Sequence, residues 1–80
     1  MKMPRDISGM ELIGALRSFG YTITRQSGSH IRITTDRDGL HRETIPNHSL
    51  LKVGTLRSIL RSIADHHKLD LDDLLRVLDL

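Results

Sequence analysis

The central part of the chain contains three short segments rich in β-branched residues, and this run most constrains the fold. The segments are residues 21–26, 29–35 and 40–45. Ser27-Gly28 separates the first two, and Asp36–Gly39, with its Asp-Gly hairpin signal, separates the last two. Pro46 ends the third segment, because proline has no N–H for a strand ladder. Strands joined by such tight turns predict a three-stranded antiparallel meander.

The second predicted strand shows which face of this sheet is buried. Ile31 and Ile33 lie on one face, and His30 and Arg32 lie on the other. This alternation is typical of a half-buried strand. We therefore expect one apolar face covered by helices and one open face that carries His30 and Arg32.

The third strand is harder to place. If Ile45 faces the core, strict alternation also turns His41 and Glu43 inward. A bulge or a twisted edge would avoid burying these polar side chains. His41 is left out of the candidate site for this reason.

Helical patterns flank the strands. Residues 8–19 begin with a Ser8–Glu11 capping box and end at Gly20. Two further helices are expected at about 54–66 and 71–78, each with leucine or isoleucine at helical spacing. The order is α-β-β-β-α with a short C-terminal helix. We predict a single α+β domain over residues 1–80, with its helices on one face of the sheet.

Composition narrows the possible functions. The 80 residues include no cysteine, which excludes disulfides and thiolate zinc sites. Residues 1–68 carry a net charge of +5 and residues 69–80 carry −3. A basic body favours polyanions such as nucleic acid, although a solvated surface of mixed charge is the plain alternative. No apolar run approaches the roughly 20 residues of a membrane span, and no signal peptide precedes the first helix, so a cytoplasmic location is expected.

Most catalytic motifs are missing. The adjacent His66 and His67 point about 100° apart on a helix, no H-E-x-x-H occurs, and no metal site is expected. Walker A, G-x-G-x-x-G and G-x-S-x-G patterns are also absent. Gly54 and Thr55, which follow Lys52, offer backbone N–H groups and a cation to a phosphate. Ordinary capping of the helix by Gly or Thr is the alternative.

One histidine has surroundings suited to chemistry. His30 follows Gly28-Ser29, and Arg25 and Arg32 are expected on the same sheet. An imidazole with an unperturbed pKa near 6.5 both takes and gives a proton at neutral pH. Metal-free RNA cleavage needs such a base to remove the 2′-OH proton and cations to stabilise the phosphorane. A surface histidine without function is the other interpretation.

The sequence resembles the HicA (YcfA-like) toxins of bacterial type II toxin–antitoxin systems. The matching stretches are Leu-Arg-Ser-Phe-Gly-Tyr (16–21), Arg-Gln-Ser-Gly-Ser-His (25–30), Ile-Pro-Asn-His (45–48) and Lys-x-Gly-Thr-Leu-Arg-Ser-Ile-Leu (52–60). Their order and spacing extend over roughly residues 9–75.

The resemblance implies a fold like that of a double-stranded-RNA-binding domain. It also implies an mRNA endoribonuclease that needs no metal or other cofactor. The partner would be a HicB-type antitoxin that blocks the active face. DNA would be bound only indirectly, through the antitoxin.

The resemblance also assigns roles to individual residues. His30 would be the catalytic acid–base group, Gly28 would allow the sharp turn, and Ser29 would contact a phosphate or orient the histidine. His48 is a second candidate for proton transfer. Further RNA contacts would come from the start of the second helix, through Lys52, Gly54, Thr55 and Arg57. Independently of the resemblance, Arg25 and Arg32 are predicted RNA contacts because they are expected beside His30 on the sheet.

Two other functions stay open. A basic face without aromatic residues also suits an RNA-binding module that recognises backbone and shape without cleaving. The acidic, leucine-rich residues 69–80 could instead make the chain a protein-interaction domain, although core packing explains their apolar stripe as well.

Overall fold

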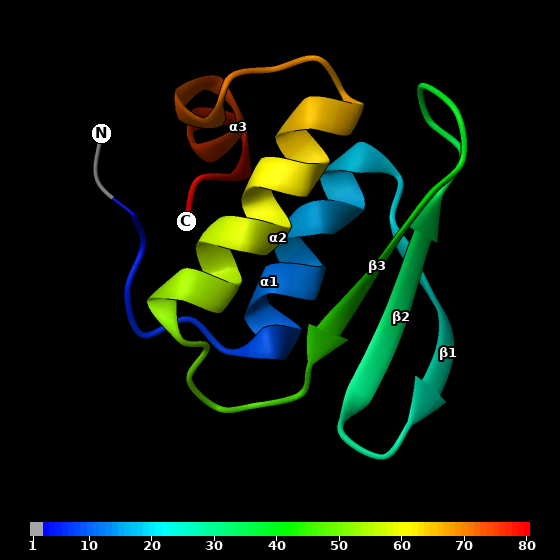
Figure 1. The fold of residues 1–80 in the computed structure, drawn as a ribbon, viewed down its shortest axis with the longest axis vertical. Helices are drawn as coiled ribbons and strands as arrows, with labels where there is room; N and C mark the ends of the chain where they lie inside the picture. Colours follow the sequence, from blue (N-terminus) through cyan, green and yellow to red (C-terminus); the bar gives the residue numbers. More distant parts are fainter. Residues whose placement is uncertain (1–2) are drawn as a thin grey trace.

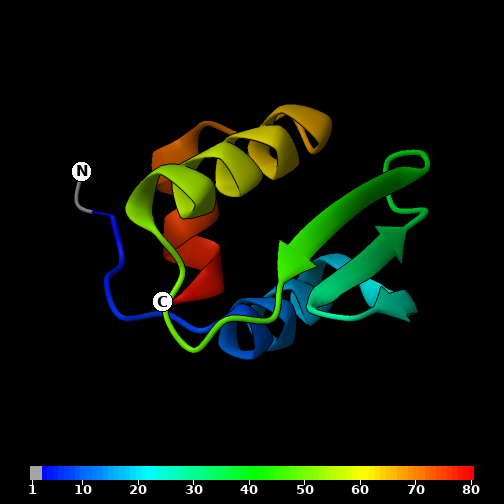
Figure 2. The same cartoon turned by 60° about the horizontal axis from the view of Figure 1, so that its bottom comes forward.

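The chain alternates from helix to sheet and back to helix in the computed structural model, which describes residues 3–80 (Figure 1). Its elements are α1 (Gly9–Leu16), the 3-10 helix η1 (Arg17–Phe19), β1 (Thr22–Ser27), β2 (His30–Thr35), β3 (His41–Pro46), α2 (Val53–His66) and α3 (Leu71–Leu78). This confirms the predicted α+β class and element order. The helices gather to one side of the sheet in Figures 1 and 2.

The three strands form one antiparallel sheet in the order β1-β2-β3. The turn between β1 and β2 is Gly28-Ser29, one residue later than the predicted Ser27-Gly28. Gly28 has φ 58°, and a two-residue hairpin loop favours glycine at its first position because that backbone is left-handed. Ser27 therefore pairs with His30 as the last step of the ladder.

A β-bulge interrupts β1. Ile23 pairs with Ile33, but the next β2 residue, Arg32, pairs with Arg25 rather than Thr24. The extra residue turns Arg25 onto the same face as Arg32, whereas strict alternation from Ile23 would turn it toward the helices. Ile23 faces the helix side at the sheet edge and stays 41% exposed.

The first helix begins at the capping box that its sequence predicts. Ser8 Oγ accepts from the Glu11 N–H at 3.0 Å, and Glu11 Oε1 accepts from the Ser8 N–H at 3.0 Å. The α-helix stops at Leu16, and the remaining predicted turn is a 3-10 helix that ends at Gly20 with φ 83°.

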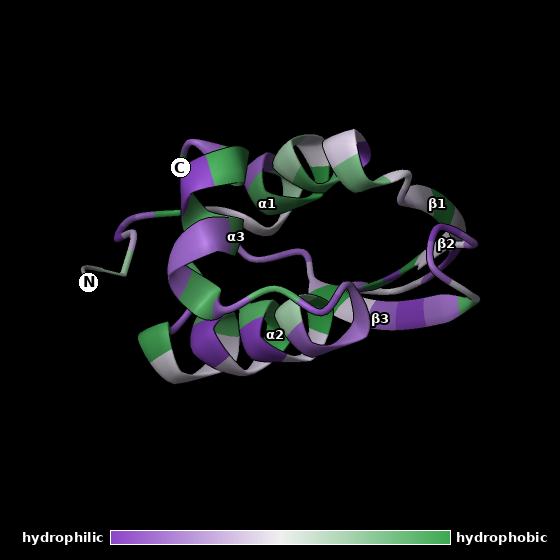
Figure 3. Cartoon of the chain, turned by 90° about the horizontal axis from the view of Figure 1, so that it is seen from above, coloured by the Kyte–Doolittle hydropathy of each residue, from purple (hydrophilic) through white to green (hydrophobic). Residues whose placement is uncertain are grey.

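The core lies between the sheet and the three helices. It contains aliphatic residues from every layer together with the two aromatic residues, namely Leu12, Ile13, Leu16, Phe19, Tyr21, Ile31, Ile33, Ile45, Leu51, Leu56, Ile59, Leu60, Ile63, Ala64, Leu74 and Leu78. Because Leu74 and Leu78 are buried, α3 uses its apolar stripe for core packing. In Figure 3, α2 carries apolar and hydrophilic residues in bands around its axis, and β3 is largely hydrophilic.

None of the helices formed by residues 3–80 has the length and apolar character required to cross a bilayer.

Strict alternation holds along β3, so no bulge relieves the polar residues there. His41 and Glu43 face inward and are half-buried. Ser62 on α2 donates to Glu43 Oε2 at 2.5 Å and lies 3.3 Å from His41 Nε2. The inward polar side chains are therefore accommodated by hydrogen bonds to the facing helix.

The Tyr21 hydroxyl connects this pair to the end of α2. It lies 2.7 Å from His41 Nδ1 and 3.1 Å from His67 Nε2, and His67 Nδ1 lies 3.0 Å from Asp38 Oδ2. The His67 hydrogen bond lowers the pKa of Asp38, which is ionised and only accepts. His67 Nδ1 therefore donates to Asp38, and the Tyr21 hydroxyl joins His67 Nε2 and His41 Nδ1 in one hydrogen-bonded chain.

Burial shifts two pKa values in this cluster. It raises the pKa of the Tyr21 phenol, with a further contribution from Glu43, so the phenol keeps its proton. Burial also lowers the pKa of His41, against the opposing effect of Glu43 and with the help of His66 and His67.

His66 also contacts the β2–β3 turn that contains Asp38. Its Nε2 lies 3.0 Å from the main-chain oxygens of both Arg37 and Gly39. Its ring stacks on His41 with 4.5 Å between centroids. Together the two C-terminal histidines of α2 fasten the β2–β3 turn to the helix layer.

Candidate nucleic-acid interface

The face of the sheet away from the helices carries the predicted site. The register places His30 beside Ser27 and Pro46, Arg32 beside Arg25 and Thr44, and Thr34 beside Thr22 and Arg42. We call this surface the bare face. Apart from Pro46, the side chains paired along it are basic or hydroxyl-bearing, and neither aromatic residue reaches it because Phe19 and Tyr21 are buried.

A shallow cavity of about 250 Å³ lies at the His30 end of the bare face. It is lined by Arg25, Ser27, His30, Arg32 and Thr44. The structure thus brings together three residues that the sequence analysis expected on one sheet, namely His30 and the two arginines.

The cavity is strongly electropositive. Within residues 3–80, no carboxylate lies within ion-pair distance of Arg25 or Arg32. These two like-charged residues sit directly opposite each other on neighbouring strands, an arrangement that is unfavourable without an anion between them. Two arginines side by side, both unpaired within the described residues, make this cavity a candidate site for an anion.

The geometry combines a proton-transfer group with two exposed cations. His30 is exposed at the first position of β2, where the hairpin turn presents it to solvent. Guanidinium groups bind phosphate oxygens through two parallel N–H donors. A phosphodiester held by Arg25 and Arg32 would lie beside the imidazole.

The loop after β3 lies against the Gly28-Ser29 turn. The Asn47 N–H donates to the Ser29 main-chain oxygen at 2.7 Å, and the Gly9 N–H donates to that of His48 at 2.9 Å. His48 is therefore held next to the turn that precedes His30. Its exposed side chain does not line the His30 cavity.

The remaining predicted contacts cluster at the start of α2. Lys52 is the N-cap residue and makes no side-chain capping bond, and Gly54 and Thr55 follow in the first turn. Capping by Gly or Thr is thus wrong, and the first N–H groups are free of side-chain acceptors. Arg57 is exposed on the same helix. None of these four residues lines the His30 cavity.

Sequence reasoning missed several residues of the bare face, among them Ser27, Arg42 and Thr44. Ser27 and Thr44 line the cavity, and Arg42 adds a third arginine opposite Thr34. The signal was present: with Asp38-Gly39 in the turn, alternation on the third strand puts Arg42 and Thr44 opposite the face of Ile45.

Across residues 3–80, no three His, Cys, Asp or Glu side chains are arranged to hold a metal ion. His67 instead makes hydrogen bonds with Tyr21 and Asp38, and His66 contacts main-chain oxygens.

Comparison with protein families matches residues 9–64 to the HicA toxin of bacterial toxin–antitoxin systems. The match includes α1, the whole sheet and α2 as far as Ala64. Searches of curated proteins and of solved structures find no match. The family match covers most of the chain and contains the entire bare face, and we conclude that the chain belongs to the HicA toxin family of bacterial toxin–antitoxin systems.

Proposed function

We propose that this toxin is an endoribonuclease that cleaves mRNA without a metal ion and uses His30 as its acid–base group. The observation that carries the proposal is the cavity in which His30 lies with Arg25 and Arg32, both without a carboxylate partner in residues 3–80. Its substrate would place the toxin in the cytoplasm.

The chemistry follows from these groups. His30 removes the proton of a ribose 2′-OH, and the 2′-oxygen forms a bond to the adjacent phosphorus. Arg25 and Arg32 stabilise the extra negative charge on the phosphorane oxygens. The bond from phosphorus to the 5′-oxygen then breaks, and that oxygen takes the proton from the imidazolium. The products are a 2′,3′-cyclic phosphate and a 5′-hydroxyl.

The test compares the wild-type chain with His30→Ala on a single-stranded mRNA in EDTA. Arg61→Ala, at an exposed position of α2, is the control for a surface change elsewhere. We expect His30→Ala to lose at least about 100-fold in cleavage rate, the usual contribution of acid–base catalysis, with an unchanged circular dichroism spectrum. Cleavage by His30→Ala at the wild-type rate would refute the proposal.

A substrate change tests the nucleophile independently. RNA with a 2′-deoxyribose at the cleaved position lacks the attacking hydroxyl and should resist the wild-type chain. Cutting of that substrate would mean that another nucleophile, such as water, attacks the phosphate.

A non-catalytic RNA-binding module is the second candidate. The bare face favours it in one respect, because it contains cations and hydroxyls but no stacking platform. Salt-sensitive RNA binding by the wild-type chain without any cleavage would support this alternative.

We further propose that a HicB-type antitoxin neutralises the toxin by covering the bare face with an acidic surface. Complementary charge is an economical way to mask a polyanion site. Hydrogen exchange of residues 22–35 should slow in the complex, and a complex with His30 open to solvent would contradict this mode of inhibition. Any binding of operator DNA would be supplied by the antitoxin.

A further inference from the structure

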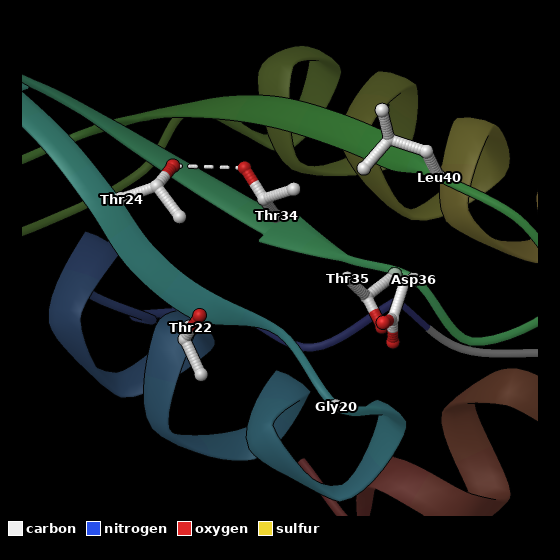
Figure 4. A pocket seen from close by; sticks show the side chains of 7 residues that line it. All are labelled: Gly20, Thr22, Thr24, Thr34, Thr35, Asp36 and Leu40. Carbon is white, nitrogen blue, oxygen red and sulfur yellow. Dashed lines mark hydrogen bonds between the residues drawn. The ribbon is translucent and has the colours of Figure 1, made fainter.

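A second cavity of about 290 Å³ opens at the other end of the bare face (Figure 4). It is lined by Gly20, Thr22, Thr24, Thr34, Thr35, Asp36 and Leu40. Thr34 lies four residues from His30 along β2, which is about 13 Å at the rise of a strand. A polynucleotide that follows β2 would therefore place different nucleotides in the two cavities.

The second cavity contains the opposite charge to the first. Asp36 is its only ionisable lining residue. Within residues 3–80 its carboxylate makes no ion pair and no hydrogen bond. A carboxylate repels phosphate, so this end of the face suits the base of a nucleotide rather than its backbone.

Turn geometry does not account for Asp36. An aspartate at the start of a turn commonly accepts from a backbone N–H two residues on. Here the Asp38 N–H makes no hydrogen bond to the Asp36 carboxylate. The neighbouring Arg37 N–H donates to Thr35 Oγ1 at 3.1 Å, and the Gly39 N–H donates to the main-chain oxygen of Asp36 at 3.2 Å. The carboxylate is left free for another donor.

The remaining lining fits a flat ring with a polar edge. The Thr24 and Thr34 hydroxyls bond to each other at 2.8 Å, which turns their oxygens inward to one another and leaves methyl groups for contact. Leu40 adds an apolar wall with 60% of its surface exposed. Figure 4 shows Thr22 facing Thr35 and Asp36 across the opening beside Gly20.

The hydrogen-bonding pattern of a carboxylate discriminates among the four bases. Both of its oxygens only accept, and single-stranded bases are read on their Watson–Crick edges. Guanine alone offers two adjacent donors there, N1–H and N2–H. Adenine and cytosine put an acceptor next to their amino group, and uracil has one N–H between two carbonyls.

We propose that this cavity is a guanine-binding subsite for the RNA strand, with Asp36 as the residue that determines the base. The inference rests on the proposed function, because it assumes that the bare face binds single-stranded RNA. It adds a sequence preference to the cut site, at about 13 Å from His30 along β2.

The test measures binding rather than cleavage. Fluorescent oligouridines with every 2′-OH methylated cannot be cut by 2′-oxygen attack, and one central uridine is replaced by G, A or C. Fluorescence anisotropy gives the Kd for wild type, Asp36→Asn and Asp65→Asn. Asp65 is an exposed acid on α2, so its variant has the same change in net charge away from the cavity.

We expect the wild-type chain and Asp65→Asn to bind the G-containing strand at least roughly fivefold more tightly than the others, the lower range for a bidentate base contact. Asp36→Asn should lose this preference, because an amide presents one donor and one acceptor. The subsite is refuted if wild type binds all four strands equally or not at all, or if Asp36→Asn keeps the guanine preference.

The two proposals fail separately. Cleavage of unmodified RNA together with base-independent binding would overturn the guanine subsite alone. Guanine-selective binding without cleavage of unmodified RNA would overturn the nuclease alone.

Discussion

Replacing Tyr21 by Phe removes one hydroxyl and leaves a fully buried ring in place. That hydroxyl is bonded to His41 at 2.7 Å and to His67 at 3.1 Å. The substitution therefore tests whether the inward histidines belong to a hydrogen-bonded network that supports the fold, since almost no packing volume is lost.

The loss of stability follows from the burial of the two partners. Each lost hydrogen bond contributes about 1 kcal/mol. The His67 side chain is 1% exposed, so its Nε2 would be buried without a hydrogen-bond partner. Leaving a buried polar atom unpaired adds roughly 1–2 kcal/mol to the loss of stability. The His41 side chain is 17% exposed and can reach water instead. The free energy of unfolding should fall by about 2–4 kcal/mol.

Urea and thermal unfolding followed by circular dichroism measure this directly. In a domain of this size the loss corresponds to a decrease in Tm of about 8–30 °C. Ser18→Ala removes an exposed hydroxyl that donates to Ala15 at 3.0 Å and should change stability by no more than about 0.5 kcal/mol. A loss below about 1 kcal/mol for Tyr21→Phe would show that the hydroxyl is not the link between the two histidines.

Three further predictions concern the same structure. The pKa of His41 is lowered from 6.5 in the folded chain, mainly by burial, so the unfolded state binds more protons. Its contribution to stability is complete above about pH 6.5 and is lost as the pH falls through the lower folded pKa; a Tm that rises from pH 7 to pH 5 would contradict this. Gly9→Ala would put Cβ 2.1 Å from a main-chain oxygen at the end of β3 and should lower the free energy of unfolding by roughly 1–3 kcal/mol. Gly14→Ala is the control: its Cβ would have nothing within 4 Å, and the substitution should stabilise the helix by roughly 0.5–1 kcal/mol. Equal melting temperatures of the two variants would rule out the close approach at Gly9. Arg32→Ala should weaken RNA binding and reduce the slope of log K against log salt by about one, while Arg61→Ala leaves both unchanged; the same slope in both variants would remove Arg32 from the interface.

Local patterns were sufficient for most of the fold because each element follows its own periodicity. The stripe of Leu56, Ile59, Leu60 and Ile63 predicted α2 to within one residue, and the bounds of α3 agree with the prediction. The alternation of Ile31 and Ile33 with His30 and Arg32 predicted which face of the sheet is bare. These are short-range properties that a sequence displays directly.

The rest depends on contacts between distant residues. The bulge that turns Arg25 toward Arg32 arises from the pairing of β1 with β2, and nothing in the local sequence of β1 marks it. His41 was left out because burying it needs partners, and those partners are Tyr21, which is 20 residues away, and Ser62, which is 21 residues away. The sequence marks Asp36 only as a turn residue, because a carboxylate without a hydrogen-bond partner cannot be recognised before its neighbours are placed.

The opposed pair of Arg25 and Arg32 has a consequence for the toxin when it is alone. Repulsion between the two guanidinium groups weakens the pairing of β1 with β2, and any polyanion that binds there relieves it. By linkage, a ligand that binds only the folded chain raises its stability, and here the relief adds to that gain. If RNA and the antitoxin bind this face as proposed, each would raise the stability of the folded toxin and protect it from unfolding and proteolysis. Added salt, by screening the pair, would imitate part of that protection.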